Sequence, residues 1–224
     1  IPLSRHIPAI CVGFCRGGGA HTREEWLDAA SVEDGMCAAV ALVCRLPWMC
    51  CESRVVVRDG IEDQKEREEI RQLLELCDQD FVPPLSHRNS TSQTNWAETE
   101  EKTDGIAEYL ENICSQHVVL WKKEGVVRAF MTWKDHFNCE NLEAYPDSCY
   151  LTTLCVWPDY RGQGISEVMY AEAEKDIAAK FPGSRITLRT WSTNGAQEHI
   201  LDKLGYSLVR RLKDDRGEGI DTVY

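Results

Sequence analysis

Apolar and polar residues alternate along the chain with two different spacings, which predict strands and helices in a mixed order. The β-branched run Arg54–Asp59 is typical of a short strand. Residues 62–78 carry apolar side chains at i, i+3, i+4 and i+7, which predicts an amphipathic helix. A polar loop over Phe81–Trp96, opened by a Pro-Pro pair, and a second helix over Lys102–Cys114 are expected to follow.

The second half of the chain continues this alternation. Because strand-like and helix-like segments succeed one another without an internal repeat, the pattern predicts a mixed α/β sheet rather than a solenoid or a propeller. The expected elements are strands over His117–Lys122, Val126–Lys134 and Cys149–Trp157, a helix over Gly164–Phe181, a strand over Arg185–Thr190, a helix over Gly195–Leu204, and strands over Tyr206–Lys213 and Gly219–Tyr224.

The first 52 residues differ from the rest in composition, being rich in Gly, Ala and Cys and only slightly acidic. The apolar run Ile7–Phe14 predicts a buried strand, and Ser31–Asp34 forms a capping box for an apolar helix through Ala38–Leu46. We therefore expect two parts, a small strand-helix appendage over residues 1–52 and a larger domain over residues 53–224.

The charge balance narrows the classes of partner. The 37 acidic residues outnumber the 25 Lys and Arg, for a net charge of −12, which argues against nucleic acid as a main partner. An acidic surface suits a cationic or amine-bearing substrate, and solubility alone explains it equally well. The longest run free of charge and proline in the N-terminal part, Gly35–Cys44, is far shorter than a bilayer needs. No signal peptide is visible, so we expect no membrane association and a cytoplasmic location.

The chain contains eleven Cys, an odd number, and no CxxC pair. Several of these Cys lie inside apolar runs, where a thiol behaves as a small hydrophobic group. Spacing of this kind favours reduced thiols in the cytoplasm over a disulfide framework.

A glycine-bearing loop between a strand and a helix is the most informative stretch. Arg161-Gly162-Gln163-Gly164 follows the apolar run that ends at Trp157-Pro158, and an amphipathic helix begins at once. Backbone N–H groups at a helix N-terminus form an anion site, and glycines let a phosphate approach closely. The P-loop motif is absent, and a dinucleotide motif would need a glycine near Val168.

This stretch resembles the signature loop of the GNAT acetyltransferase superfamily, [RQ]xxGx[GA], with Ser166 in the last small position. The resemblance extends over Arg54–Tyr224, and Asn194 and Leu204-Gly205-Tyr206 match two further features of the family. It implies a mixed, largely antiparallel sheet flanked by helices. It also implies acetyl transfer from acetyl-CoA to an amine of a small molecule or a peptide.

The resemblance implies where acetyl-CoA would bind. The pyrophosphate would lie on the N–H groups of Gly162–Ser166, and the pantetheine arm along the strand edge Leu154–Val156. A backbone N–H near Cys155 or Val156 would polarise the thioester carbonyl. Arg161 would lie beside the phosphates, unless it simply pairs with Asp159. The expected cofactor-binding residues are Leu154, Cys155, Val156, Arg161, Gly162, Gln163, Gly164, Ile165, Ser166 and Asn194.

The catalytic residues stay unassigned at this point. Many relatives carry a Tyr in the helix after the Asn, but the matching position here is Leu201. His199, Tyr206, Cys155 and a water are the candidates for proton transfer, and a purely positional mechanism is the alternative. A homodimer is a further expectation.

The N-terminal stretch Gly17–Trp26 resembles the end of the catalytic domain in the zinc-dependent exopeptidase and deacylase family that includes aminoacylase. His21 matches a metal ligand of that family, but its other ligands are absent, so we expect no metal site in this chain. Two alternatives remain: the C-terminal remnant of a bifunctional metallopeptidase or deacylase with an acetyltransferase, and a non-catalytic acyl-CoA-binding module.

Overall fold

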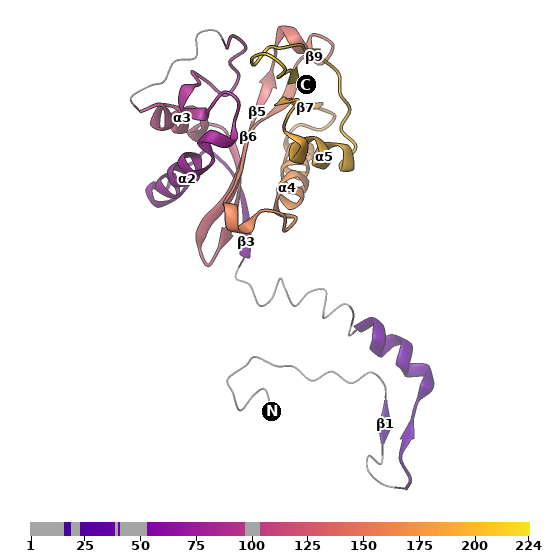
Figure 1. The fold of residues 1–224 in the computed structure, drawn as a ribbon. Helices are drawn as coiled ribbons and strands as arrows, with labels where there is room; N and C mark the ends of the chain where they lie inside the picture. Colours follow the sequence, from indigo (N-terminus) through magenta and orange to yellow (C-terminus); the bar gives the residue numbers. More distant parts are fainter. Residues whose placement is uncertain (1–15, 19–22, 39, 41–52, 97–103) are drawn as a thin grey trace. The chain divides into compact units, whose positions relative to one another are not determined.

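The computed structural model describes residues 16–18, 23–38, 40, 53–96 and 104–224 (Figure 1). Its contacts divide the chain into two units, Ile1–Glu52 and Ser53–Tyr224. The predicted strand Ile7–Phe14, the candidate ligand His21 and most of the predicted helix through Ala38–Leu46 lie outside the described residues.

In the first unit, β1 (Gly17–Gly18) pairs with β2 (Trp26–Leu27) in an antiparallel ribbon. A 3-10 turn, η2 (Ala29–Ser31), leads into helical residues 32–38. The Ser31 hydroxyl, expected to cap this helix, accepts a hydrogen bond from the backbone N–H of Arg16 and donates one to the carbonyl of Asp28. Ser31 therefore ties the turn to the ribbon.

The second unit is built on a five-stranded sheet in the order β3-β4-β5-β6-β7. The first four strands are antiparallel, and β7 runs parallel to β6. This largely antiparallel sheet with flanking helices confirms the expected fold class. The strands are β3 (Ser53–Asp59), β4 (His117–Lys123), β5 (Val126–Phe137), β6 (Ser148–Val156) and β7 (Ile186–Leu188).

Helices cover both faces of the sheet (Figure 1). On one face, α2 (Gln64–Cys77) and α3 (Gly105–Cys114) pack against Val118 and Leu120 of β4. On the other face, α4 (Ile165–Lys180) packs against Val119, the residue between them. Successive side chains of a strand point to opposite faces of the sheet. The apolar run Val118–Trp121 of β4 therefore contributes side chains to the core on each face. The last helix is α5 (Gly195–Lys203).

The C-terminal region differs from the prediction. The expected strand Arg185–Thr190 is divided, because Thr190–Trp191 forms β8 in a separate sheet of order β8-β10-β9. The expected strands Tyr206–Lys213 and Gly219–Tyr224 shrink to β9 (Arg211–Leu212) and β10 (Thr222–Val223).

Backbone hydrogen bonds continue the contact beyond the two short strands. The N–H of Tyr224 donates to Arg210 O at 2.8 Å, and the N–H of Val209 donates to Tyr224 O at 2.9 Å. Alternation alone predicts longer strands because it does not show which residues find a partner strand.

Candidate functional site

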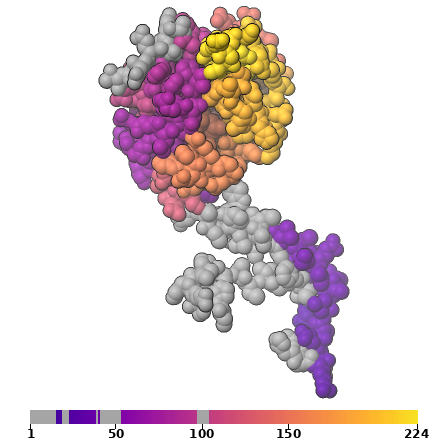
Figure 2. Space-filling model, in the orientation of Figure 1, coloured from indigo at the N-terminus to yellow at the C-terminus, as the bar shows by residue number. Residues whose placement is uncertain are grey.

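A cleft of about 600 Å³ opens where β6 and β7 separate. The two strands pair from Cys149 to Leu151 of β6, and the next residues of β6 line the cleft. On this face of the unit, the segments of α2 and its following loop (purple to magenta) meet those of α4 and α5 (orange) (Figure 2). All of the expected cofactor-binding residues except Gln163 line the cleft.

A register shift in β6 decides which backbone groups face the cleft. Thr132 pairs with Thr153 and Trp133 pairs with Leu151, so Thr152 is skipped. Such a bulge changes which residues point toward a given neighbouring strand. The edge of β6 beyond Thr152 is therefore offset from the part that pairs with β7.

The hydrogen bonds at the end of β6 identify the outward-facing groups. The N–H of Trp157 donates to Arg128 O at 2.8 Å, on the β5 side, whereas Val156 O accepts from Arg161 Nε at 3.0 Å. By alternation, the backbone of Cys155 faces β5, and that of Val156 and Leu154 faces the open edge. Of the two N–H groups expected to polarise a carbonyl, Val156 is the one directed to the cleft.

The loop before α4 has the backbone conformation that glycine permits. Gly162 has φ 72° and Gly164, the N-cap of α4, has φ 76°, both in the left-handed region. A Cβ at either position would meet no atom within 4 Å, so the backbone is open to an approaching group. The side chain of Gln163 turns back to donate to Asp159 O at 2.9 Å, which explains its absence from the cleft wall.

Arg161 pairs with Asp80 at 2.7 Å, rather than with Asp159. Its guanidinium also donates to the Cys77 Sγ atom at 3.4 Å. Together with the bond to Val156 O, these contacts hold Arg161 against the end of β6 and the end of α2. The positive charge of Arg161 therefore lies beside the edge of β6, a position that the sequence of the loop does not predict.

Two cysteines meet at this end of the cleft. A hydrogen bond from the Cys155 thiol, together with the Arg161 guanidinium, lowers the pKa of Cys77 to about 7. Burial, and the charge on Cys77, raise the pKa of Cys155 well above its ordinary value. A thiol held protonated inside the core is a poor proton-transfer group, so this environment argues against Cys155 as a catalyst and makes Cys77 the more acidic of the two thiols.

The other two catalytic candidates lie in different surroundings. His199 is exposed on α5 and lines the cleft. Tyr206 lines a second hollow of about 770 Å³ together with Leu201, and its hydroxyl donates to Glu174 Oε1 at 2.8 Å. Burial and the Glu174 carboxylate raise the pKa of Tyr206.

Asn194 has a structural task as well as a place in the cleft wall. Its Oδ1 accepts from the N–H of Gln197 at 3.2 Å and so caps α5. Sequence reasoning missed Tyr170, which lines the cleft and hydrogen-bonds through its hydroxyl to the Gln197 side chain. Tyr170 lies one helical turn after Ser166, so the two residues share a helix face, and this spacing could have predicted that Tyr170 lines the cleft.

The far end of the cleft is aromatic. Phe81 and Trp191 line it with ring centroids 5.6 Å apart. Trp96, at the other end of the loop Phe81–Trp96, packs against the guanidiniums of Arg189 and Arg216, at 4.8 and 4.6 Å. The loop therefore shapes this end through Phe81, while Trp96 supports charged groups behind it.

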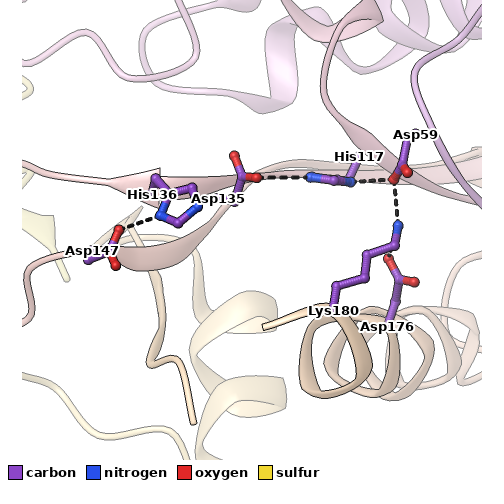
Figure 3. Close-up of polar contacts among 7 residues, drawn as sticks. All are labelled: Asp59, His117, Asp135, His136, Asp147, Asp176 and Lys180. Atoms are coloured by element: carbon purple, nitrogen blue, oxygen red, sulfur yellow. Dashed lines mark hydrogen bonds and ion pairs between the residues drawn. The ribbon is translucent and has the colours of Figure 1, made fainter. Parts of the chain in front are cut away.

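A second polar cluster joins the sheet to α4, away from the cleft (Figure 3). His117 Nδ1 lies 2.5 Å from Asp59 Oδ1, and its Nε2 lies 3.6 Å from Asp135. Ligand atoms of Asp59, His117 and Asp176 lie within 4.8 Å of one another, a spacing that a metal could use. The Lys180 ammonium, however, is bonded to both Asp59 (2.5 Å) and Asp176 (3.1 Å), so the cluster is already an ion-pair network.

Among the residues that the structure describes, no helix has the length and apolar character needed to cross a bilayer.

Comparisons with known proteins agree with this architecture. Residues 70–206, more than half of the chain, match the profile of the Acetyltransferase (GNAT) family. A comparison with curated proteins found no match. The match begins after the N-terminal stretch, so the resemblance of Gly17–Trp26 to zinc exopeptidases stays a prediction.

Several solved structures share the fold. A GNAT-family protein from Desulfovibrio desulfuricans is 17% identical, with a TM-score of 0.52, over 76% of this chain and 96% of its own. An N-acetyltransferase from Staphylococcus aureus Mu50 is 15% identical, with a TM-score of 0.51, over 76% and 95%. Arabidopsis thaliana NAA60, in complex with a bisubstrate analogue, is 17% identical, with a TM-score of 0.50, over 76% and 95%.

Proposed function

The chain belongs to the GNAT acetyltransferase family, and we propose that residues 53–224 transfer an acetyl group from acetyl-CoA to an amine. One observation carries the proposal. The open edge of β6 at Leu154 and Val156 and the glycine loop Gly162–Gly164 line the same cleft. A site for a nucleotide thioester needs both features, an anion site for its phosphates and a strand edge for its amide-containing arm.

The residues present suit acetyl-CoA. The N–H groups of Gly162–Ser166 would hold the pyrophosphate, because the first turn of α4 leaves them without helical partners and the helix dipole favours negative charge there. The outward backbone of Leu154 and Val156 would hold the pantetheine arm. When bound, the coenzyme supplies an activated acetyl group as a thioester.

The contribution of the protein to the chemistry is positional and electrostatic. The Val156 N–H would donate a hydrogen bond to the thioester carbonyl oxygen, the atom on which negative charge accumulates during attack. The cleft would hold the neutral amine within reach of the carbonyl carbon, so that the new C–N bond replaces the C–S bond and CoA departs as a thiolate. Because Cys155 is buried and Tyr206 is bonded to Glu174, we propose that solvent in the open cleft takes the proton from the amine nitrogen and gives one to the CoA thiolate.

Titration calorimetry with acetyl-CoA, followed by an assay of CoA release with an amine panel, tests the proposal. We expect saturable binding by the full chain and loss of binding in Gly164→Trp, which blocks phosphate approach. Gly183→Trp is the matched control, since Gly183 also has a positive φ and open space around its Cβ. Absence of binding at millimolar acetyl-CoA would refute the proposal, and binding without CoA release would favour the non-catalytic module.

The N-terminal unit has a separate test. If Gly17–Trp26 derives from a zinc hydrolase and His21 still binds the metal, zinc should raise the melting temperature in the wild type and not in His21→Ala. Equal melting curves with and without zinc would end the hydrolase interpretation for this chain.

A further inference from the structure

Three arginines from distant parts of the sequence surround one indole ring. The guanidinium carbons of Arg88, Arg189 and Arg216 lie 5.5, 4.8 and 4.6 Å from the centroid of Trp96. We call these three residues the arginine cluster. Cations stack favourably on the face of an indole, which explains how the cluster is held but not what balances its charge.

The hydrogen bonds of the arginine cluster go to neutral acceptors. Arg88 donates to the carbonyls of Pro83 and Val82, at 3.0 and 3.4 Å. Arg216 donates to Val82 O and, at 2.9 Å, to Thr222 Oγ1, whereas Arg189 donates to Thr91 O at 3.4 Å. Within the described part of the chain, none of the three forms an ion pair with a carboxylate.

Asp215 is the acidic residue whose charge acts on Arg216, and it is already engaged. Its Oδ2 accepts from Trp96 Nε1 at 2.8 Å and from Thr222 Oγ1 at 2.5 Å. Asp215 therefore bonds to the same indole that the three guanidiniums surround. The region is locally cationic, although the chain as a whole carries a net charge of −12.

Burial makes the charges of Arg88 and Arg216 costly. The pKa of Arg189 is raised instead, because nearby Tyr150 and Tyr224 outweigh the effect of burial. The exposed fractions of Arg88 and Arg216 are 5% and 9%, and burial and the neighbouring guanidiniums lower the pKa of both. Guanidinium groups stay protonated near neutral pH, so the cost is not relieved by deprotonation. Buried charges are normally paired, and a cationic cluster with too few anions is stabilised by an anionic ligand.

Arg189 is the member of the cluster that lines the cleft. It follows Leu188, which pairs with Leu151 at the point where β6 and β7 separate. Leu154, at the outward edge, is three residues further along β6, or about 10 Å at the usual rise of a strand. Arg189 and the expected acetyl position thus line the same cleft, with Phe81 and Trp191 also in its wall.

We propose that the acceptor amine also carries a carboxylate, which binds Arg189 at the aromatic end of the cleft, with Arg88 and Arg216 reinforcing the positive potential. A guanidinium offers a planar fork that matches the two oxygens of a carboxylate. This inference rests on the proposed acetyltransferase function and defines its acceptor as an amino acid or a related amine-bearing acid.

Matched pairs of amines test the substrate class. β-Alanine against β-alaninamide, and glycine against glycinamide, keep the amine and change the only carboxylate to a carboxamide. We expect at least tenfold higher kcat/KM for at least one acid over its amide in the wild type. Arg189→Gln should remove the preference, whereas Arg185→Gln, an exposed arginine on the same segment, should keep it. Equal use of acid and amide would overturn the proposal.

A binding measurement separates this proposal from the catalytic one. The full chain saturated with CoA is melted, at constant ionic strength, with N-acetyl-β-alanine and N-acetylglycine and with their amides. A higher melting temperature with the acids, lost in Arg189→Gln and partly kept in Arg189→Lys, is expected even if turnover is absent. No stabilisation by any acid, or greater stabilisation by phosphoethanolamine, would overturn it. Failure of CoA itself to bind, with the acid effect retained in its absence, would refute only the acetyltransferase function.

Discussion

Arg161 donates a hydrogen bond from Nε to the carbonyl oxygen of Val156 at 3.0 Å while its guanidinium pairs with Asp80 at 2.7 Å. The first residue of the glycine loop is thereby fixed to the last residue of β6 and to the segment after α2. The two halves of the proposed coenzyme site, loop and strand edge, are held together before any ligand arrives.

Arg161→Gln should weaken acetyl-CoA binding, because the loop and the strand edge lose this connection. A hydrogen bond from a charged group contributes about 1.5 kcal/mol or more, so we expect roughly a tenfold higher Kd by calorimetry. Arg185→Gln serves as the control at an exposed position. An unchanged Kd in Arg161→Gln would mean that the loop is positioned without this contact.

Cys77 should ionise near neutral pH. Its folded-state pKa is about 7 against an ordinary value of 9.0, so the thiolate stabilises the fold fully above pH 9.0 and this contribution is lost as the pH falls through 7. We expect thiolate absorbance with a midpoint near pH 7 in the wild type minus Cys77→Ser difference. The stability advantage of the wild type should rise over the same range.

Cys114→Ser provides the matched control for that titration, since burial raises the pKa of Cys114. Its difference spectrum should contain no step near pH 7. Arg161→Gln should move the Cys77 midpoint upward. A Cys77 midpoint above pH 8.5 in the wild type would contradict the assigned environment.

His199→Gln should change kcat/KM by less than about threefold, because a solvent-exposed residue in an open cleft is replaceable by water in proton transfer. The pH profile of kcat/KM should keep its shape. A fall of more than about a hundredfold, the usual size of a general acid–base contribution, would instead make His199 the catalytic base or acid.

Gly105→Ala should destabilise the domain. A Cβ at the start of α3 would lie 1.8 Å from the carbonyl oxygen of Ser86, so the loop that carries Phe81 and Arg88 must shift. Overpacking of this kind costs about 1–3 kcal/mol, measurable by urea denaturation. Gly195→Ala, at the same position of α5 but in open space, should be neutral or stabilising by up to ~1 kcal/mol. Equal free energies of unfolding for the two variants would show that the loop at Ser86 shifts without measurable cost.

Local patterns predicted the parts of the fold that local physics determines. The strands β3 to β6 and the helices α2 and α4 follow from side-chain spacing, because burial on one or both faces leaves a clear period. The glycine loop could also be predicted, because the positive φ angles at Gly162 and Gly164 favour glycine over other residue types.

The side-chain contacts that define the chemistry of the site could not be predicted from local sequence patterns. Asp80 pairs with Arg161 across 81 positions, and Arg88, Arg189 and Arg216 meet around Trp96 from separate segments. Each of these residues looks like an ordinary surface charge in its own stretch. They are brought together by the sheet topology, which the periodicity of apolar residues along the sequence does not show.

The two ends of the cleft have different origins in the chain. The proposed coenzyme end comes mainly from one continuous stretch, from Leu151 to Glu167, whereas the proposed acceptor end joins Phe81 to Arg189 and Trp191. In the proposed enzyme, substitutions in these two distant segments would change which amine is accepted, while the residues expected to bind acetyl-CoA stay the same. With this division, the acceptor specificity of the fold could change one segment at a time. It also gives protein engineers two separate sets of positions to randomise.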